Sequence, residues 1–71
     1  MYKFKVELYD KLMYGRTLFW LADQLGYSHI TLSLIFNGHK YVKPALALAI
    51  VKTIDNSYEI DDFFEYIEKE F

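Results

Sequence analysis

Apolar residues recur at helical spacing through the middle of the chain. Leu18, Leu21 and Leu25 repeat at intervals of three and four, which predicts one apolar face on a helix over residues 18–25. The same spacing predicts a second helix over residues 29–36. Its apolar face is formed by the side chains Leu32, Ile35 and Phe36, with Ser28 at its start.

The break between these helices is short and contains typical turn residues. Gly26 can adopt the left-handed conformation with which many helices end. Thr17 and Ser28 each stand directly before a predicted helix, where a hydroxyl can accept a hydrogen bond from a free backbone N–H. Asn37 and Gly38 end the second helix. The pattern predicts two short helices joined by a tight turn.

Helices are also predicted on both sides of this pair. The first covers residues 3–14 and ends at Gly15, and another begins at Pro44 after a loop over 39–43. A turn at 55–57 precedes a last helix, which we expect from Ile60 or Asp61 to Glu70. The prediction is one all-α, five-helix domain over residues 1–71. Its further core candidates are Val6, Tyr9 and Met13, or Leu8 and Leu12; then Leu46, Ala47, Ile50, Val51 and Ile54; and Phe63, Phe64, Ile67 and Phe71.

The central pattern resembles the helix-turn-helix of the Cro/cI repressor family of temperate phages, the lambda-repressor-like or XRE type. The residues that carry the likeness are Leu21-Ala22, the turn Gly26-Tyr27-Ser28, Leu32, Ile35 and Gly38. The likeness extends over about residues 3–67, with the motif at about 17–37. It implies a DNA-binding fold in which the second helix of the motif enters the major groove.

Composition favours a partner over a catalytic role. Seventy-one residues make a small core, yet 54% are hydrophobic and 20% aromatic, so we expect some apolar surface to remain exposed for a partner. No nucleophile–base pair, glycine-rich phosphate loop or metal-ligand spacing is present, so we expect no enzyme, cofactor or metal site. The absence of a signal peptide or membrane-length apolar run predicts a cytoplasmic protein.

Charge is divided unevenly along the chain. Residues 1–54 hold seven Lys or Arg against three acids, whereas residues 55–71 hold one Lys against seven acids. Dedicated DNA binders are usually more basic than the net charge of −2 seen here. The residues best placed for phosphate contacts are Arg16, Lys40 and Lys43.

The positions that the family uses to read DNA depart from its usual residues. Base edges are hydrogen-bond donors and acceptors, but Ile30 and Leu34 offer neither. Leu18, Phe19 and Trp20 stand where relatives carry three polar residues. The candidate surface, facing either a protein partner or the DNA groove, consists of Leu18, Phe19, Trp20, His29, Ile30, Ser33, Leu34 and Asn37.

Two functions follow from the resemblance. In the first, a Cro-like repressor dimerises on a short palindrome and inserts residues 29–36 into the major groove. In the second, a modulator of repression, or antirepressor, binds the cognate cI-like repressor through the apolar surface and blocks its DNA binding. The family favours the first and the residues favour the second. We favour the antirepressor; both are regulators of a phage lysis–lysogeny switch.

Overall fold

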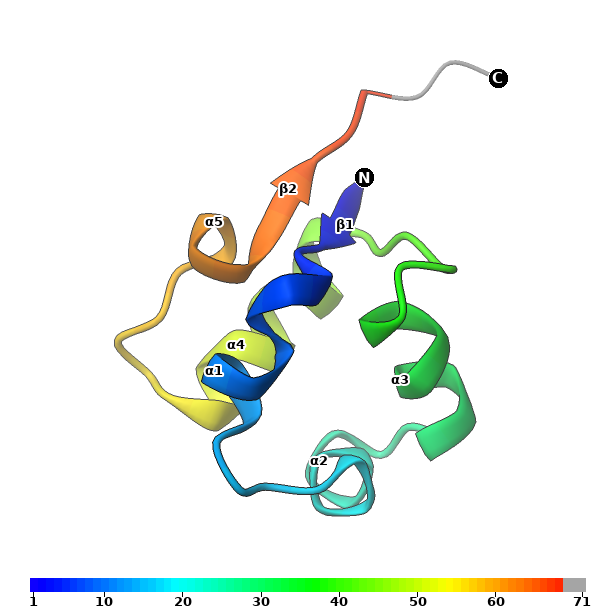
Figure 1. Cartoon of the computed structure of the whole chain (residues 1–71), viewed down its shortest axis with the longest axis vertical. Helices are drawn as coiled ribbons and strands as arrows, with labels where there is room; N and C mark the ends of the chain where they lie inside the picture. The colour runs from blue at the N-terminus through cyan, green and yellow to red at the C-terminus, as the bar shows by residue number, and fades with distance from the viewer. Residues whose placement is uncertain (69–71) are drawn as a thin grey trace.

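The longest helix, α4 (Pro44–Ile54), packs against three other helices of the bundle (Figure 1). The computed structural model describes residues 1–68, and the statements below concern those residues. Pro44 occupies the start of α4, where its missing N–H costs nothing, as the sequence predicted. The remaining elements are β1 (Tyr2–Phe4), a single 3₁₀ turn η1 (Val6–Leu8), α1 (Tyr9–Met13), α2 (Leu18–Leu25), α3 (His29–Phe36), α5 (Ile60–Phe63) and β2 (Phe64–Tyr66).

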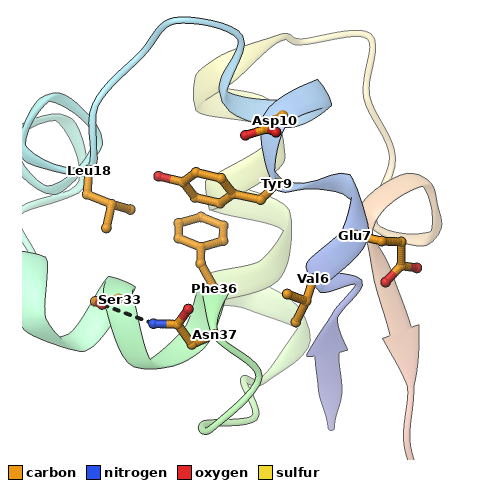
Figure 2. Close-up of a pocket in the computed structure, with 8 residues that line it drawn as sticks. All are labelled: Val6, Glu7, Tyr9, Asp10, Leu18, Ser33, Phe36 and Asn37. Carbon is orange, nitrogen blue, oxygen red and sulfur yellow. Dashed lines mark hydrogen bonds between the residues drawn. The ribbon is translucent and has the colours of Figure 1, made fainter.

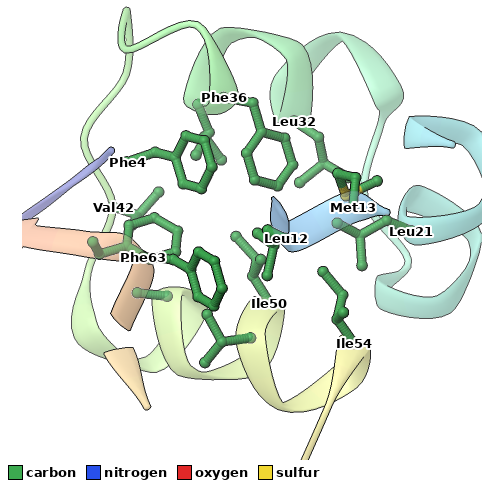
Figure 3. Close-up of a cluster of buried hydrophobic side chains, with 14 of the residues drawn as sticks. Phe4, Leu12, Met13, Leu21, Leu32, Phe36, Val42, Ile50, Ile54 and Phe63 are labelled. Carbon is green, nitrogen blue, oxygen red and sulfur yellow. The ribbon is translucent and has the colours of Figure 1, made fainter. Parts of the chain in front are cut away.

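The helices enclose one apolar core, to which every helix and both strands contribute (Figure 3). α4 presents four buried residues at helical spacing, which confirms its predicted core face except at the half-buried Leu46. No polar or charged residue among those described is buried. The buried residues are Phe4, Leu12, Met13, Leu21, Ala22, Leu32, Ile35, Phe36, Val42, Ala47, Ile50, Val51, Ile54, Phe63 and Phe64.

The two predicted helices at the centre of the chain are confirmed. α2 and α3 have the predicted bounds, and the turn between them occupies residues 26–28. The Thr17 hydroxyl accepts a hydrogen bond from Trp20 N at 3.1 Å, and the Ser28 hydroxyl accepts one from Ile30 N at 3.1 Å. Gly26 adopts the expected left-handed conformation with φ of 73°.

The predicted last helix is wrong beyond its first turn. α5 ends at Phe63, and the chain then extends as β2, which pairs antiparallel with β1. Phe4 and Phe64 face each other across the two strands with ring centroids 5.4 Å apart. Since these two rings fill the same part of the core, packing with β1 outweighs the helical spacing of the apolar residues. Ile67 is half-buried, and the predicted core residue Phe71 lies outside the described part of the chain.

The predicted first helix over 3–14 is also too long. Its beginning forms β1 and η1, because Tyr2 is hydrogen-bonded to Val42 on one side while β1 pairs with β2 on the other. Val6, a core candidate, is exposed, whereas Leu12 and Met13 are buried. The helix ends one residue early, because Tyr14 already has a left-handed φ of 35° before Gly15. The fold is therefore mostly helical, as predicted, with a two-stranded sheet added.

A turn at Asp55–Ser57 ends α4. The Asp55 carboxylate accepts hydrogen bonds from the backbone N–H of Ser57 at 2.9 Å and from its hydroxyl at 2.7 Å. These bonds stabilise the charged form, so the pKa of Asp55 lies below its ordinary value of 3.8.

Candidate functional site: the outer face of α2 and α3

α3 is apolar on the side that faces solvent as well as on the side that faces the core. Leu32, Ile35 and Phe36 are buried. On the opposite side, Ile30 is 63% exposed and Leu34 is 44% exposed. A helix that is apolar all round is normally covered on all sides, and here one side has no cover among residues 1–68. This apolar row is the central feature of the candidate site.

Phe19 and His29 join the start of α2 to the start of α3. Phe19 is 68% exposed, and its ring lies against the imidazole of His29 with centroids 4.4 Å apart. The sequence left open whether other parts of the chain cover Phe19, and the structure shows that the described residues leave it exposed. Phe19 therefore extends the exposed apolar surface of α3 onto α2.

Trp20 lies at the margin of this surface. Each residue of a helix turns the next by about 100°, so Trp20 projects further round α2 than Phe19 does. Trp20 is 36% exposed, and the guanidinium carbon of Arg16 lies over its ring at 5.6 Å from the ring centroid. Arg16, which the sequence offered as a phosphate contact, places its charge over this aromatic ring.

A groove separates η1 and the first residues of α1 from α2 and α3 (Figure 2). Its volume is about 550 Å³. The ring of Phe36 lies edge-on to Tyr9, with centroids 5.5 Å apart, and Phe36 is the lining residue of this groove that is buried. We call it the acidic groove, because Glu7 and Asp10 are among its lining residues. Figure 2 draws the Glu7 carboxylate directed away from Phe36 and Leu18. Its lining residues are Val6, Glu7, Tyr9, Asp10, Leu18, Ser33, Phe36 and Asn37.

The acidic groove joins three predicted surface residues with five that sequence reasoning did not place at the site. Leu18, Ser33 and Asn37 were predicted, and Asn37 Nδ2 donates a hydrogen bond to Ser33 Oγ at 3.3 Å. Glu7 and Asp10 were missed as site residues. Their three-residue spacing within the predicted first helix was a signal for a shared face.

The two carboxylates have no partner within residues 1–68. The salt bridge in this part of the chain joins Lys52 to Glu59, with Nζ and Oε1 3.5 Å apart. Neither Glu7 nor Asp10 makes an ion pair or a side-chain hydrogen bond with another described residue. Their negative charge is therefore available to a ligand.

A second groove of about 560 Å³ lies on the other side of α3, against the first turns of α4. Lys40 and Lys43, both predicted phosphate contacts, stand at it with exposed side chains. We call it the basic groove. Its lining residues are Met1, Leu25, Tyr27, Thr31, Lys40, Tyr41, Val42, Lys43, Ala45, Leu46 and Ala49.

The structure thus brings most of the predicted residues together in one region, which we call the α2–α3 face. The exposed row of Ile30 and Leu34 runs along its centre, with the acidic groove on the Ser33 side and the basic groove on the Thr31 side. The face consists of Leu18, Phe19, His29, Ile30, Ser33, Leu34 and Asn37, with Trp20 at its margin.

Comparison of the chain with protein-family models, with curated proteins and with solved structures found no match. Among residues 1–68, no three or more His, Asp or Glu side chains gather closely enough to bind a metal ion. None of the helices described has the length and apolar character needed to cross a membrane.

Proposed function

We propose that this protein is a cytoplasmic regulator of a phage-type lysis–lysogeny switch, and that it acts as an antirepressor. In this proposal the domain is a lambda-repressor-like helix-turn-helix, with α2, the turn at 26–28 and α3 as its motif. The α2–α3 face binds the DNA-binding domain of the cognate cI-like repressor and occludes the surface with which that repressor contacts its operator.

The exposed apolar row on α3 is the observation that carries the proposal. Phe19, Ile30 and Leu34 together expose more apolar surface than a DNA-reading helix needs, since base edges are recognised by hydrogen bonds. Burying one such side chain contributes about 1.5–3 kcal/mol, which makes these residues suitable anchors for a protein interface. The unpaired carboxylates beside the row would oppose the approach of phosphate and favour a basic partner surface.

A Cro-like DNA-binding repressor is the second candidate function. It is favoured by the exposed Lys40 and Lys43 next to α3, and by polar side chains on the outer side of that helix at His29, Ser33 and Asn37. In that function the protein would dimerise on a palindromic operator, and the lysines would contact phosphates.

Fluorescence anisotropy separates the two functions. Labelled operator DNA is titrated at low salt with this protein alone, with the repressor encoded by the neighbouring gene, and with both. For the antirepressor we expect no tight binding of DNA by this protein, and loss of the repressor's DNA binding when this protein is added. Tight, salt-sensitive DNA binding by this protein alone would establish the Cro-like function instead.

A matched pair of variants assigns the surface. Leu34→Glu places a charge in the α2–α3 face, whereas Leu48→Glu places the same charge on α4 at a residue of similar exposure, 40% against 44%. We expect Leu34→Glu, like Ile30→Glu, to abolish repressor binding while Leu48→Glu leaves it unchanged. In the Cro-like function, Lys40→Ala combined with Lys43→Ala would have the larger effect. Normal repressor binding by Leu34→Glu would show that the interface lies elsewhere.

A further inference from the structure

The α2–α3 face carries three strips of different chemistry that run along α3. The central strip is the exposed apolar row of Ile30 and Leu34. Ser33 lines the acidic groove and Thr31 lines the basic groove. Residues two positions apart on a helix differ in direction by about 200°, so the two charged strips lie on opposite sides of the row.

None of the three strips is satisfied within the described part of the chain. Ile30 and Leu34 are exposed, and an exposed apolar row between polar strips is typical of a protein interface. Asp10 on one side, and Lys40 and Lys43 on the other, make no ion pair with a described residue. Asp10 supplies the charge of the acidic strip, since the Glu7 carboxylate is directed away from Phe36 and Leu18 (Figure 2).

The order of the strips, acidic, apolar and basic, makes the face complementary to a second copy of itself. Two identical faces meet about a twofold axis that lies in their interface. If that axis runs along α3, the two helices are parallel, the apolar rows cover each other, and acidic strips oppose basic strips on both sides. If the axis runs across α3, the helices are antiparallel, and acidic strips oppose acidic strips while basic strips oppose basic strips. Like charges repel, so the parallel arrangement is favoured.

We propose that the α2–α3 face binds the same face of a second copy of this chain, with the two α3 helices parallel. Ile30 and Leu34 then each contact their own counterpart, and Asp10 of one copy approaches the lysines of the other. The inference does not rest on the proposed function but bears on its regulation. A repressor bound to the same face would exclude the second copy, so the monomer would be the active species.

Sedimentation equilibrium of the purified chain tests for the dimer. We expect the average mass to rise from one chain towards two between about 1 µM and about 1 mM, as for a small, transient interface. Leu34→Glu brings two carboxylates together at the axis and should weaken dimerisation by at least about 10-fold. The control Leu48→Glu adds the same charge on α4 at similar exposure and should change it by less than about 2-fold.

Charge reversal tests the order of the strips. The variant Glu7→Lys, Asp10→Lys has two basic strips, and the variant Lys40→Glu, Lys43→Glu has two acidic strips. Each variant alone should dimerise at least about 10-fold more weakly than wild type, because like charges then meet on both sides of the row. An equimolar mixture of the two variants should recover a dimer that contains one chain of each kind.

Disulfide trapping tests the direction of the helices. The chain contains no cysteine, so an introduced thiol can pair only with another introduced thiol. A disulfide requires the two Cα atoms to lie within about 7 Å of each other. In the parallel arrangement Ile30→Cys and Leu34→Cys should each form a disulfide with a second chain of the same variant. In the antiparallel arrangement the main product would instead join one chain of each variant.

Three results would overturn the inference. They are a chain that stays monomeric up to about 1 mM, dimerisation that Leu34→Glu and Leu48→Glu weaken alike, and disulfides that form mainly between the two different cysteine variants. The proposed function is judged separately, by whether the chain removes the repressor from its operator. A monomeric chain that does so would leave the proposed function standing and the dimer wrong.

Discussion

The two sides of α3 differ in charge and in what lies beneath them. The acidic groove is lined by Glu7 and Asp10 and rests on Phe36, a core residue that contacts both Phe4 and Tyr9 through its ring. The basic groove is lined by Lys40 and Lys43, and its lining combines the buried Val42 with half-buried or exposed residues of α2 and α4. A surface of this kind suits neither a polyanion nor a polycation over its whole width.

The charges of the two grooves bear on which ligand the α2–α3 face can bind. A helix presented outward from a two-helix motif can read DNA only if its flanks tolerate phosphate on both sides. Here the basic groove attracts phosphate and the acidic groove repels it, with the apolar row of α3 between them. A protein surface can match all three strips, because a protein can place basic, apolar and acidic residues side by side.

Truncating one apolar lining residue in each groove should give the largest difference, in the free energy of unfolding. We expect Phe36→Ala to lower the free energy of unfolding by about 3–5 kcal/mol, because it removes a buried ring and leaves a cavity beside Phe4 and Tyr9. Leu25→Ala, at a half-buried residue of the basic groove, should cost less than about 2 kcal/mol. Urea unfolding followed by circular dichroism measures both. Equal losses of unfolding free energy would mean that Phe36 and Leu25 are equally well packed.

Reversing the charges in each groove should affect repressor binding and DNA binding differently. We expect Glu7→Lys with Asp10→Lys to weaken repressor binding by about 100-fold, and Lys40→Glu with Lys43→Glu to change it by less than about 10-fold. For duplex DNA the order should invert, since the first variant removes repulsion and the second removes attraction. Anisotropy titrations with both ligands measure this. A larger effect of the lysine variant on repressor binding would place the main contact in the basic groove.

Salt should weaken contacts made by the apolar row of α3 less than contacts made by the charged residues of the two grooves. A complex centred on Phe19, Ile30 and Leu34 should lose no more than about 10-fold in affinity between 50 and 200 mM salt, because apolar burial is not screened. A DNA complex with several phosphate contacts would lose about 1000-fold or more over the same range. Calorimetric titrations at several salt concentrations measure the slope. A steep slope for the repressor complex would assign its affinity to the flanks.

The sequence predicted the centre of this site better than its edges. α2, α3 and their caps follow from local signals, because Thr17, Gly26 and Ser28 act on backbone groups only a few residues away. The outward direction of Ile30 and Leu34 followed from the same helical period. These features need no knowledge of distant contacts.

The acidic groove could not be predicted, because it depends on contacts between distant segments. Glu7 and Asp10 line it only because the chain before them forms β1, which is held between Val42 and the C-terminal β2. The spacing of Ile60, Phe63 and Ile67 fits a helix as well as a short helix followed by a strand, so the local pattern could not reveal β2. The first and last predicted helices were therefore wrong together, and for the same reason.

The smallest predicted effect is on stability at low pH, which sets the pH range in which binding by the two grooves can be compared. The pKa of Asp55 is lowered in the folded state, so its contribution to stability is present above the ordinary value of 3.8 and is lost as pH falls through the lower folded value. Ser57→Ala removes the hydroxyl that donates at 2.7 Å and should lower the thermal midpoint slightly near neutral pH. The difference from wild type should disappear once the pH is below the folded pKa of Asp55.

Asp55→Asn provides the control for this effect, because it removes the titrating group and leaves the turn. In that background, Ser57→Ala should shift the midpoint by the same amount at every pH. Thermal unfolding by circular dichroism from about pH 2 to pH 7 measures both series. A difference between Ser57→Ala and wild type that grows as pH falls would have the wrong sign for a lowered pKa of Asp55. It would assign the acid limit of the fold to other carboxylates.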